Sequence, residues 1–536
     1  MSSKLKIVPN CCPFLLFLGL ALHALLSGVA SGLDNLVCRK NYKSEYSLDI
    51  KGMINLDSTF WNLLAFDNLT ELKELKMHRC PPLPLHHFHM LSSLKTLRLW
   101  RSSSIIFPLV GGESCAEYQF QVECMSIVEW GASAKELTQL LAYFPNLSEL
   151  NLWDCDKILW LGVAEKRAKT TPVPPSSAVK ADGVQIEQHQ QQDGTRGEEE
   201  IAAEGLLLLP PQLQQLEIRL CPELSLRFNP VDYNREAGRT AGGQGLQGLR
   251  FLRSLDITGC PRFLSFYSSL SSSPCFPFPA SLECLTLEGA VGTATLLPLS
   301  NLTALTNLSI WGCWDLRGEG LRPLLAQGPL TKLTVRGTPN LFTGFEPPPP
   351  HEHELPSSSS KLQELDTDDV ASTLAAPICA LLSSSLTELR FWEDKEVERF
   401  TKEQDEALQL LTSLERIRFW KCDKLQCLPA GLHRLPNLKR LDIYRCAAIR
   451  SLPKDGLPSS LQGLEIDSCS TNRSVPKKCL PSSLQKLVII NCPAIRSLPK
   501  VGDLPSSLGE LVVRDSESEE LRRHCHKLIG TVPIVI

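Results

Sequence analysis

The amino-acid sequence predicts an α/β repeat solenoid, in which short similar units stack one on the next. A nine-residue frame of the form L-x-x-L-x-L-x-x-C recurs along the chain, at steps of 23 or 24 residues in its C-terminal third. The chain has 536 residues, whereas a single globular core stops growing near about 250–300 residues. A repeat array accommodates this length without one large core.

The frame itself explains how one unit folds. In the copy that runs from Leu414 to Cys422, whose residues we number as positions 1 to 9, L-x-L forms a short strand. Side chains alternate along a strand, so positions 4 and 6 point inward and the residues between them point outward. A period of this length with this frame is the leucine-rich repeat. We therefore expect a leucine-rich-repeat horseshoe with a parallel, concave β-sheet and a convex side of loops and short helices.

Fourteen good copies of the frame are present, too many to arise by chance. They begin at Leu72, Leu94, Leu147, Leu213, Leu252, Leu282, Leu305, Leu330, Leu386, Leu414, Leu438, Leu461, Leu484 and Leu508. Weaker copies at Val122 and Leu362 fill two of the long gaps.

The copies and the polar stretches between them define the expected domains. These are a leader at 1–32, an N-terminal cap at 33–62, the solenoid at 63–516 and a C-terminal cap or tail at 517–536. Three polar segments interrupt the solenoid, at about 163–205, 228–247 and 344–361. Such insertions bulge from one face and leave the stack intact.

The leader has the pattern of a secretory signal. Lys4 and Lys6 precede an apolar run from Phe14 to Leu26, and small residues follow it. A membrane-spanning helix needs about 20 apolar residues, so we expect no stable transmembrane span. The leader is interpreted either as a cleaved signal peptide or as a spurious start.

Nine copies carry cysteine at position 9 of the frame, where the chain turns inward after the strand. They are Cys80, Cys155, Cys221, Cys260, Cys313, Cys422, Cys446, Cys469 and Cys492. A buried thiol at this position can hydrogen-bond the backbone of neighbouring turns, although weakly. We found no C-x-x-C pair to begin a zinc site. We therefore predict a ladder of structural thiols and no metal.

Position 7 of the frame faces outward on the concave side and is aromatic in six copies. The aromatic residues are Trp100, Trp153, Trp311, Trp392, Trp420 and Tyr444. Large exposed aromatics are typical of binding surfaces, but adjacent strands can also stack them on one another. We predict a partner-binding stripe, in which Arg390, Arg418 and Arg440 flank the aromatics of the last three of these copies.

Composition and motifs exclude several classes of function. The net charge of -4 and the mixed charges of the outward positions do not favour a nucleic-acid partner. We found no phosphate-binding loop, nucleophile elbow or metalloprotease motif, and no nucleophile, base and orienting group can be placed together. We expect no enzyme activity and no cofactor.

The sequence around Cys422 to Pro429 and around Leu438 to Pro453 resembles the repeat region of plant nucleotide-binding, leucine-rich-repeat disease resistance proteins of the cereal type. The resemblance covers about residues 63–536. It implies a cytoplasmic, non-catalytic recognition region that binds a pathogen effector, a guarded host protein or a receptor that contains the nucleotide-binding NB-ARC domain. The chain lacks the motifs of that domain, so it resembles a receptor fragment that begins inside the repeats.

Two other classes of repeat protein remain as alternatives. A secreted or cell-surface binding protein is favoured by the leader and by five glycosylation sequons, at Asn68, Asn146, Asn301, Asn307 and Asn472. Against it, cysteine rather than asparagine dominates position 9. The substrate-recognition repeats of ubiquitin ligases also use cysteine there, but an F-box and an Ile-Thr-Asp-like run after the cysteine are missing.

Overall fold

A computed structural model describes most of the chain but leaves several segments out. The described residues are 6–7, 33–40, 45–52, 61, 69–101, 119–164, 204–226, 245–268, 276–343, 345, 360–453, 455–470, 480–496, 498–514, 519–526 and 534–535. Nearly all of the predicted leader and most of each predicted insertion lie outside these residues. The chain divides into two compact units, Met1–Ser281 and Leu282–Ile536, which we describe separately.

Unit 1 is built on a parallel sheet whose strands follow the repeat frame. Its strands are β3 (Tyr46–Gly52), β4 (Glu74–His78), β5 (Thr96–Trp100), β6 (Cys124–Val128), β7 (Glu149–Trp153), β10 (Gln215–Arg219) and β11 (Ser254–Thr258), paired in that order. The register aligns position 4 with position 4, as in Leu75 against Leu97.

The predicted N-terminal cap supplies the first parallel strand of unit 1. Strand β2 (Leu33–Lys40) runs antiparallel to β3, and β1 (Lys6–Ile7) pairs with the outer edge of β2. Strand β3 then continues into β4 in the same register as the repeats. The series of strands in the repeat register therefore begins inside the segment predicted as a cap, at β3.

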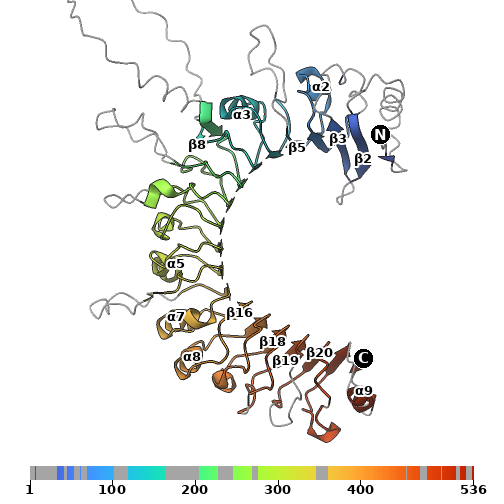
Figure 1. Ribbon diagram of the computed structural model, residues 1–536, viewed down its shortest axis with the longest axis vertical. Helices are drawn as coiled ribbons and strands as arrows, with labels where there is room; N and C mark the ends of the chain where they lie inside the picture. Colours follow the sequence, from blue (N-terminus) through green and yellow to red (C-terminus); the bar gives the residue numbers. More distant parts are fainter. Residues whose placement is uncertain are drawn as a thin grey trace, which may run out of the picture. The chain divides into compact units, whose positions relative to one another are not determined.

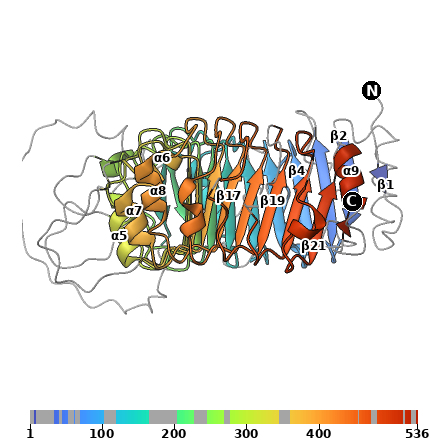
Figure 2. The ribbon, with the colours of Figure 1, turned by 90° about the horizontal axis from the view of Figure 1, so that it is seen from below.

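Unit 2 repeats the same arrangement with more regular spacing. Its strands are β12 (Cys284–Glu288), β13 (Asn307–Trp311), β14 (Lys332–Arg336), β15 (Glu364–Thr367), β16 (Glu388–Trp392), β17 (Arg416–Trp420), β18 (Arg440–Tyr444), β19 (Gly463–Asp467), β20 (Lys486–Ile490), β21 (Glu510–Arg514) and β22 (Ile534–Val535). Each pairs in parallel with the next. Figure 2 shows β17, β19 and β21 as parallel arrows.

The two weaker copies of the frame form strands like the good ones. The copy at Val122 contains β6 and the copy at Leu362 contains β15, and both lie between good copies in the expected order. Their inward residues, such as Met125 and Leu365, are buried. The prediction of strands at these two places is confirmed.

The core of each unit is a set of columns that run from repeat to repeat. Positions 1, 4, 6 and 9 are buried, as in Leu438, Leu441, Ile443 and Cys446, which are all 0% exposed. Burial of one such aliphatic side chain contributes roughly 1.5–3 kcal/mol. A unit that ended after one repeat would expose its columns, so neighbouring repeats stabilise one another.

Short helices and turns cover the side of each sheet that lies away from the outward positions. Helix α3 (Ala134–Leu141) and the small parallel pair of β8 (Trp160–Val163) and β9 (Leu206–Leu209) lie there in unit 1, and α5 (Leu321–Gln327), α7 (Ala376–Leu382) and α8 (Lys402–Leu408) in unit 2 (Figure 1). The predicted repeat fold with short helices and loops on its back is confirmed.

Polar caps explain where two of these helices begin. Ser133 accepts a hydrogen bond from the Glu136 N–H, and the Glu136 carboxylate accepts one from the Ser133 N–H. Thr401 and Gln404 make the same reciprocal pair at the start of α8. These capping boxes satisfy N–H groups that a helix of two turns would otherwise leave free.

Candidate functional site

The outward side of the strands, which we call the strand face, is the candidate functional surface of each unit. It consists of frame positions 3, 5, 7 and 8. In strand β17, Arg416, Arg418 and Trp420 are partly exposed while Ile417 and Phe419 are buried. The alternation that the sequence predicts thus places two polar rows and an aromatic-rich row on one surface.

Position 8 has a backbone conformation that the sequence analysis missed. It is left-handed, with φ between 47° and 76°, in fourteen of the described repeats, of which ten have a residue other than glycine. The ten are Arg79, Arg101, Glu129, Asp154, Leu220, Glu393, Lys421, Arg445, Ser468 and Asn491. The left-handed turn re-aims the chain inward toward position 9. This conformation costs an L-residue about 1–2 kcal/mol. The packing of the repeat therefore holds these ten residues in a conformation that glycine would adopt more easily.

The nine position-9 cysteines lie in the core, one per repeat, next to the strands. All nine are at most 6% exposed and carry free thiols. The Cys446 Sγ lies 3.6 Å from the carbonyl oxygen of Phe419 in the preceding repeat, and the Cys492 Sγ lies 3.5 Å from that of Ile466. Eight of the nine thiols thus donate a weak hydrogen bond that ties one repeat to the one before it, whereas the Cys221 Sγ accepts one from the Cys155 N–H of the preceding repeat.

Burial raises the pKa of Cys80 to about 12 and that of Cys313 to about 11, from an ordinary value of 9.0. Hydrogen bonds from neighbouring thiols instead lower the pKa of Cys221 and of Cys492. A thiol that stays protonated at neutral pH is a poor nucleophile and a poor metal ligand. Among the described residues, no group of three metal-binding side chains lies close enough to hold an ion.

In unit 2 the position-7 aromatics form a continuous stack. Trp392 and Trp420 are parallel, with ring centroids 4.7 Å apart and planes inclined by 7°, and Tyr444 follows at 5.2 Å from Trp420. Strand β14 brings in Arg336, whose guanidinium lies 5.0 Å from the Trp311 ring and 4.2 Å from the Trp392 ring. The cation thus joins two rings that lie three strands apart in the sheet order.

A chain of ion pairs runs beside this stack on positions 3 and 5. The buried carboxylate of Asp442 accepts hydrogen bonds from Arg416 and Arg418, at 2.7 and 3.0 Å from their Nε atoms. Glu388 contacts Arg390 at 2.9 Å and lies within 3.7 Å of both other arginines. Burial raises the pKa of Glu388, but the three arginines outweigh it and leave the pKa below its ordinary value of 4.5.

The structure places the three predicted flanking arginines in two different situations. Arg390 and Arg418 belong to the ion-pair chain and are only about a quarter to a third exposed. Arg440, at position 3 of β18, is exposed, and no described acidic side chain pairs with it. Arg440 is therefore the one of the three whose charge is directed wholly to solvent.

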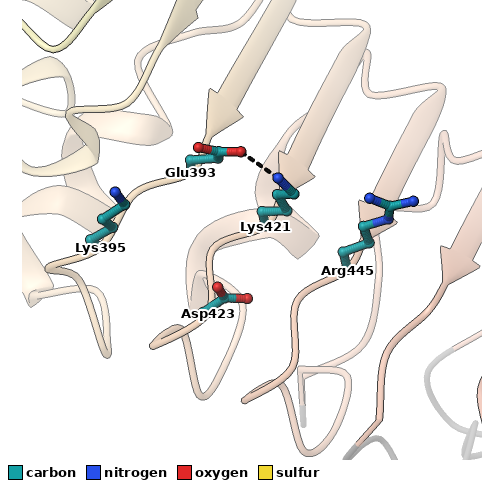
Figure 3. A pocket seen from close by; sticks show the side chains of 5 residues that line it. All are labelled: Glu393, Lys395, Lys421, Asp423 and Arg445. Carbon is teal, nitrogen blue, oxygen red and sulfur yellow. Dashed lines mark hydrogen bonds and ion pairs between the residues drawn. The ribbon is translucent and has the colours of Figure 1, made fainter.

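A shallow hollow lies where β16, β17 and β18 end. Glu393, Lys421 and Arg445 line it from position 8, and Lys395 and Asp423 line it from the following loops (Figure 3). The Lys421 ammonium donates to the Glu393 carboxylate at 2.7 Å, while the Arg445 guanidinium lies 5.7 Å from the Trp420 ring. The hollow therefore combines an internal ion pair with a cation held against the aromatic stack.

In unit 1 the aromatics are separate. Trp100 stacks on His78 of the neighbouring strand at 4.2 Å with planes inclined by 8°. Trp153, 40% exposed, has Arg219 over its ring at 5.3 Å. Trp153 and Trp311 are the most exposed of the six predicted aromatics. The structure thus groups Trp311, Trp392, Trp420 and Tyr444 in unit 2 and places Trp100 and Trp153 at two separate positions in unit 1.

A second hollow lies at the ends of β3, β4 and β5. Its lining includes Lys51, His78, Arg79, Trp100 and Arg101. Burial lowers the pKa of His78 below its ordinary value of 6.5, and nearby Lys51 and Lys76 add to this against the attraction of Asp49. The imidazole is therefore mainly neutral at pH 7 and contributes a stacking surface rather than a charge.

Three solved structures are similar to the chain. The chain is similar to TLR13 as solved in a complex with single-stranded RNA (TM-score 0.49, 16% identity, 93% of this chain and 56% of that chain). It is also similar to a leucine-rich-repeat protein of Leptospira interrogans (TM-score 0.37, 16% identity, 88% and 97% covered). A third is the functional domain of InlJ from Listeria monocytogenes, which includes a cysteine ladder (TM-score 0.34, 13% identity, 87% and 72% covered).

These likenesses concern the fold alone, and this chain spans a little over half the length of the TLR13 chain. No protein-family profile and no curated protein sequence matches it. The recurring frame, the parallel register and the inward ladders define the chain as a leucine-rich-repeat protein, a class that is typically non-catalytic and binds through its surface. No helix among the described residues is long and apolar enough to cross a membrane.

Proposed function

We propose that this chain is a non-catalytic recognition solenoid of the plant disease-resistance type, which binds a pathogen effector or a host protein. We place the binding surface on the strand face of unit 2, at Trp311, Trp392, Trp420, Tyr444 and the flanking arginines. The ligands implied by the sequence resemblance also include a receptor that contains the NB-ARC domain. Trp100 and Trp153 form a second, smaller part of the proposed surface on unit 1.

The observation that carries this proposal is the aromatic stack held beside alternating charges. Tyrosine, tryptophan and arginine are the residues that dominate the binding energy of protein interfaces. Stacking and ion pairing hold these side chains in place before any partner arrives, so binding costs little side-chain entropy. Charges of both signs on the surface suit a protein partner better than a nucleic-acid backbone.

We also propose that the chain works in a reducing compartment. The resemblance to plant disease resistance proteins implies that this compartment is the cytoplasm. Fourteen described cysteines are free thiols, and thiols persist unpaired where glutathione keeps them reduced. Expression in plant cells with a C-terminal fluorescent tag tests this point. A cleaved, glycosylated product in the secretory pathway would instead support a secreted or cell-surface binding protein.

Partner capture with matched variants tests the binding surface. The full chain and the triple variant Trp392→Ala, Trp420→Ala, Tyr444→Ala are used side by side for proximity labelling in plant cells. We expect the proteins enriched by the natural chain to be lost with the triple variant. They should be retained by Trp314→Ala, which removes a 68% exposed tryptophan outside the stack.

The charge-reversal variant Arg440→Glu keeps the test decisive if the triple variant unfolds. Arg440 is exposed and lies outside the ion-pair chain, so its reversal leaves the fold intact while it alters the proposed surface. Partner proteins recovered equally with the natural chain, with Arg440→Glu and with any folded aromatic variant would contradict the proposal.

A further inference from the structure

The strand face of unit 1 is electrically divided along its length. On positions 3, 5, 7 and 8 of β3, β4 and β5, five cationic and two acidic side chains are present. On the same positions of β6, β7, β10 and β11 there are five acidic side chains and one cationic. The cationic residues of the first part are Lys51, Lys76, Arg79, Arg98 and Arg101, and the acidic residues of the second are Glu129, Glu149, Asp154, Glu217 and Asp256.

The ion pairs within unit 1 do not neutralise all the charged side chains of either part of its strand face. Glu74 contacts both Lys76 and Arg98, at 3.3 and 3.1 Å, and Arg101 pairs with Glu129 at 2.5 Å. No described acidic side chain pairs with Lys51 or Arg79, which both line the hollow at the ends of β3, β4 and β5. The hollow therefore has two cations with their charge available and a third shared with one carboxylate.

The acidic part has the opposite imbalance. Arg219 is the one cation on its outward positions and is shared between Glu217 and Asp256. Asp154 lies near Asp156 and Glu129, and partial desolvation together with their repulsion raises its pKa above the ordinary value of 3.8. A cationic group placed here would relieve that repulsion.

We infer that the strand face of unit 1 binds a bipolar protein segment, with acidic side chains over β3 to β5 and basic side chains over β6 to β11. The acidic side chains contact Lys51, Arg79 and Arg101 in the hollow, and the stacked rings of His78 and Trp100 form its wall. This inference rests on the proposed role of the chain in binding proteins. It adds the charge pattern of the partner and a site on unit 1.

The dimensions of the sheet set the spacing of the two charged blocks. Strands lie about 4.8 Å apart, so the centre of the cationic part, at β4, is roughly 17 Å from the centre of the acidic part. An extended peptide rises about 3.4 Å per residue, which places the two blocks about five residues apart. A nucleic-acid strand carries negative charge along its whole length, so the acidic part of the face repels it.

Fluorescence anisotropy with labelled synthetic peptides and the full-length chain tests this inference. The probe peptide has an acidic block and a basic block separated as above, and the control peptide has the same composition with its charges scrambled. We expect the bipolar peptide to bind more tightly than the scrambled one, and its affinity to fall as salt is raised. Equal affinity for the two peptides would overturn the inference.

Variants of the hollow locate the binding. The double variant Lys51→Gln, Arg79→Gln should lower the affinity for the bipolar peptide by about tenfold or more, because two charge-assisted contacts are lost. The control Arg250→Gln removes an exposed arginine of unit 1 outside the strands and should leave the affinity unchanged. An unchanged affinity would contradict the inference, provided that the double variant has the same circular dichroism spectrum and melting temperature as the unmodified chain.

Two further measurements separate this site from its alternatives. An oligothymidine of the same length should bind more weakly than the bipolar peptide, and tighter binding of the oligonucleotide would overturn the assignment to protein. The unit 2 variant Trp392→Ala, Trp420→Ala, Tyr444→Ala should bind the peptide normally. A loss of binding in that variant would place the peptide on unit 2 and contradict the site proposed here, whatever the outcome of the partner-capture test.

Discussion

The strand faces of the two units follow one repeat frame but use it differently. In unit 2 the aromatics of position 7 join through Arg336 into one stack, and Asp442 and Glu388 tie the neighbouring arginines together. In unit 1 Trp100 and Trp153 contact separate partners, His78 and Arg219, and opposite charges are separated along the sheet. The difference shows that the frame determines where side chains point. Their neighbours determine whether the charged and aromatic side chains pair with one another or remain available to a partner.

The largest expected effect is the loss of Asp442, which would break the ion-pair chain of unit 2. Its side chain is 5% exposed and binds two arginines, so Asp442→Ala leaves both without their shared carboxylate. We expect unit 2 to lose about 2–3 kcal/mol of stability, somewhat below the usual cost of breaking a fully buried pair. Chemical denaturation followed by circular dichroism measures the loss.

The matched change in unit 1 is Asp49→Ala, which removes the partner of His78. Asp49 is more exposed, at 17%, and its contact with His78 is longer, at 3.4 Å. We expect a loss of under about 1 kcal/mol, as for an exposed pair. Equal losses in the two variants would show that the carboxylate contacts of Asp442 and Asp49 do not differ in strength.

Removal of Arg336 should separate the two ends of the aromatic stack. The guanidinium makes a two-pronged contact with Asp366 at 3.1 and 2.7 Å and lies between Trp311 and Trp392. We expect Arg336→Gln to cost about 1–2 kcal/mol and to shift tryptophan fluorescence to longer wavelength as two rings gain water contact.

Arg219→Gln is the corresponding control in unit 1. Among the described residues, Arg219 covers the ring of Trp153 and joins it to no second aromatic. A fluorescence shift of the same size in both variants would mean that Arg336 covers rings but does not connect them.

Acid should affect the two units in different pH ranges. The pKa of His78 is lowered in the folded state, so the unfolded chain binds the proton more tightly. The stability that neutral His78 contributes is present above its ordinary pKa of 6.5 and is lost as the pH falls below 6.5. The pKa of Glu388 is also lowered, and its contribution is present above 4.5 and lost only as the pH falls below 4.5.

Denaturation curves recorded across this pH range, with His78→Gln as the control, check the prediction. We expect His78→Gln to flatten the decline between pH 7 and the folded pKa of His78. A decline that persists unchanged in the variant would assign it to another group.

The smallest expected effect concerns the left-handed position 8. Gly312 has φ of 64°, and the nearest atom to an added Cβ would be 3.9 Å away, so Gly312→Ala tests backbone strain without a clash. We expect a loss of about 1 kcal/mol. In the control Gly463→Ala, an added Cβ also has room and φ is not left-handed, so stability should change little. Similar losses in both variants would argue against strain at position 8.

The sequence by itself determined the repeat, its register and the inward ladders, because a period of 23 or 24 residues and the alternation of side chains along a strand are local properties. It also placed Trp100, Trp153, Trp311, Trp392, Trp420 and Tyr444 on the outward positions. The left-handed turn at position 8 gave only a weak signal in the sequence. Four repeats carry glycine there, but ten repeats carry another residue, so no glycine pattern stands out.

Only the tertiary structure decided how those outward residues interact. Arg336 contacts both Trp311 and Trp392, which lie tens of residues apart in the sequence. The charge division of unit 1 likewise depends on residues from strands that are far apart in the sequence. Which side chains meet depends on the pairing of strands in the sheet and not on their separation in sequence, since an insertion changes the distance along the chain but not the neighbour in the sheet. The frame therefore predicts the rows of the surface, and the stacking of repeats sets the contacts within and between them.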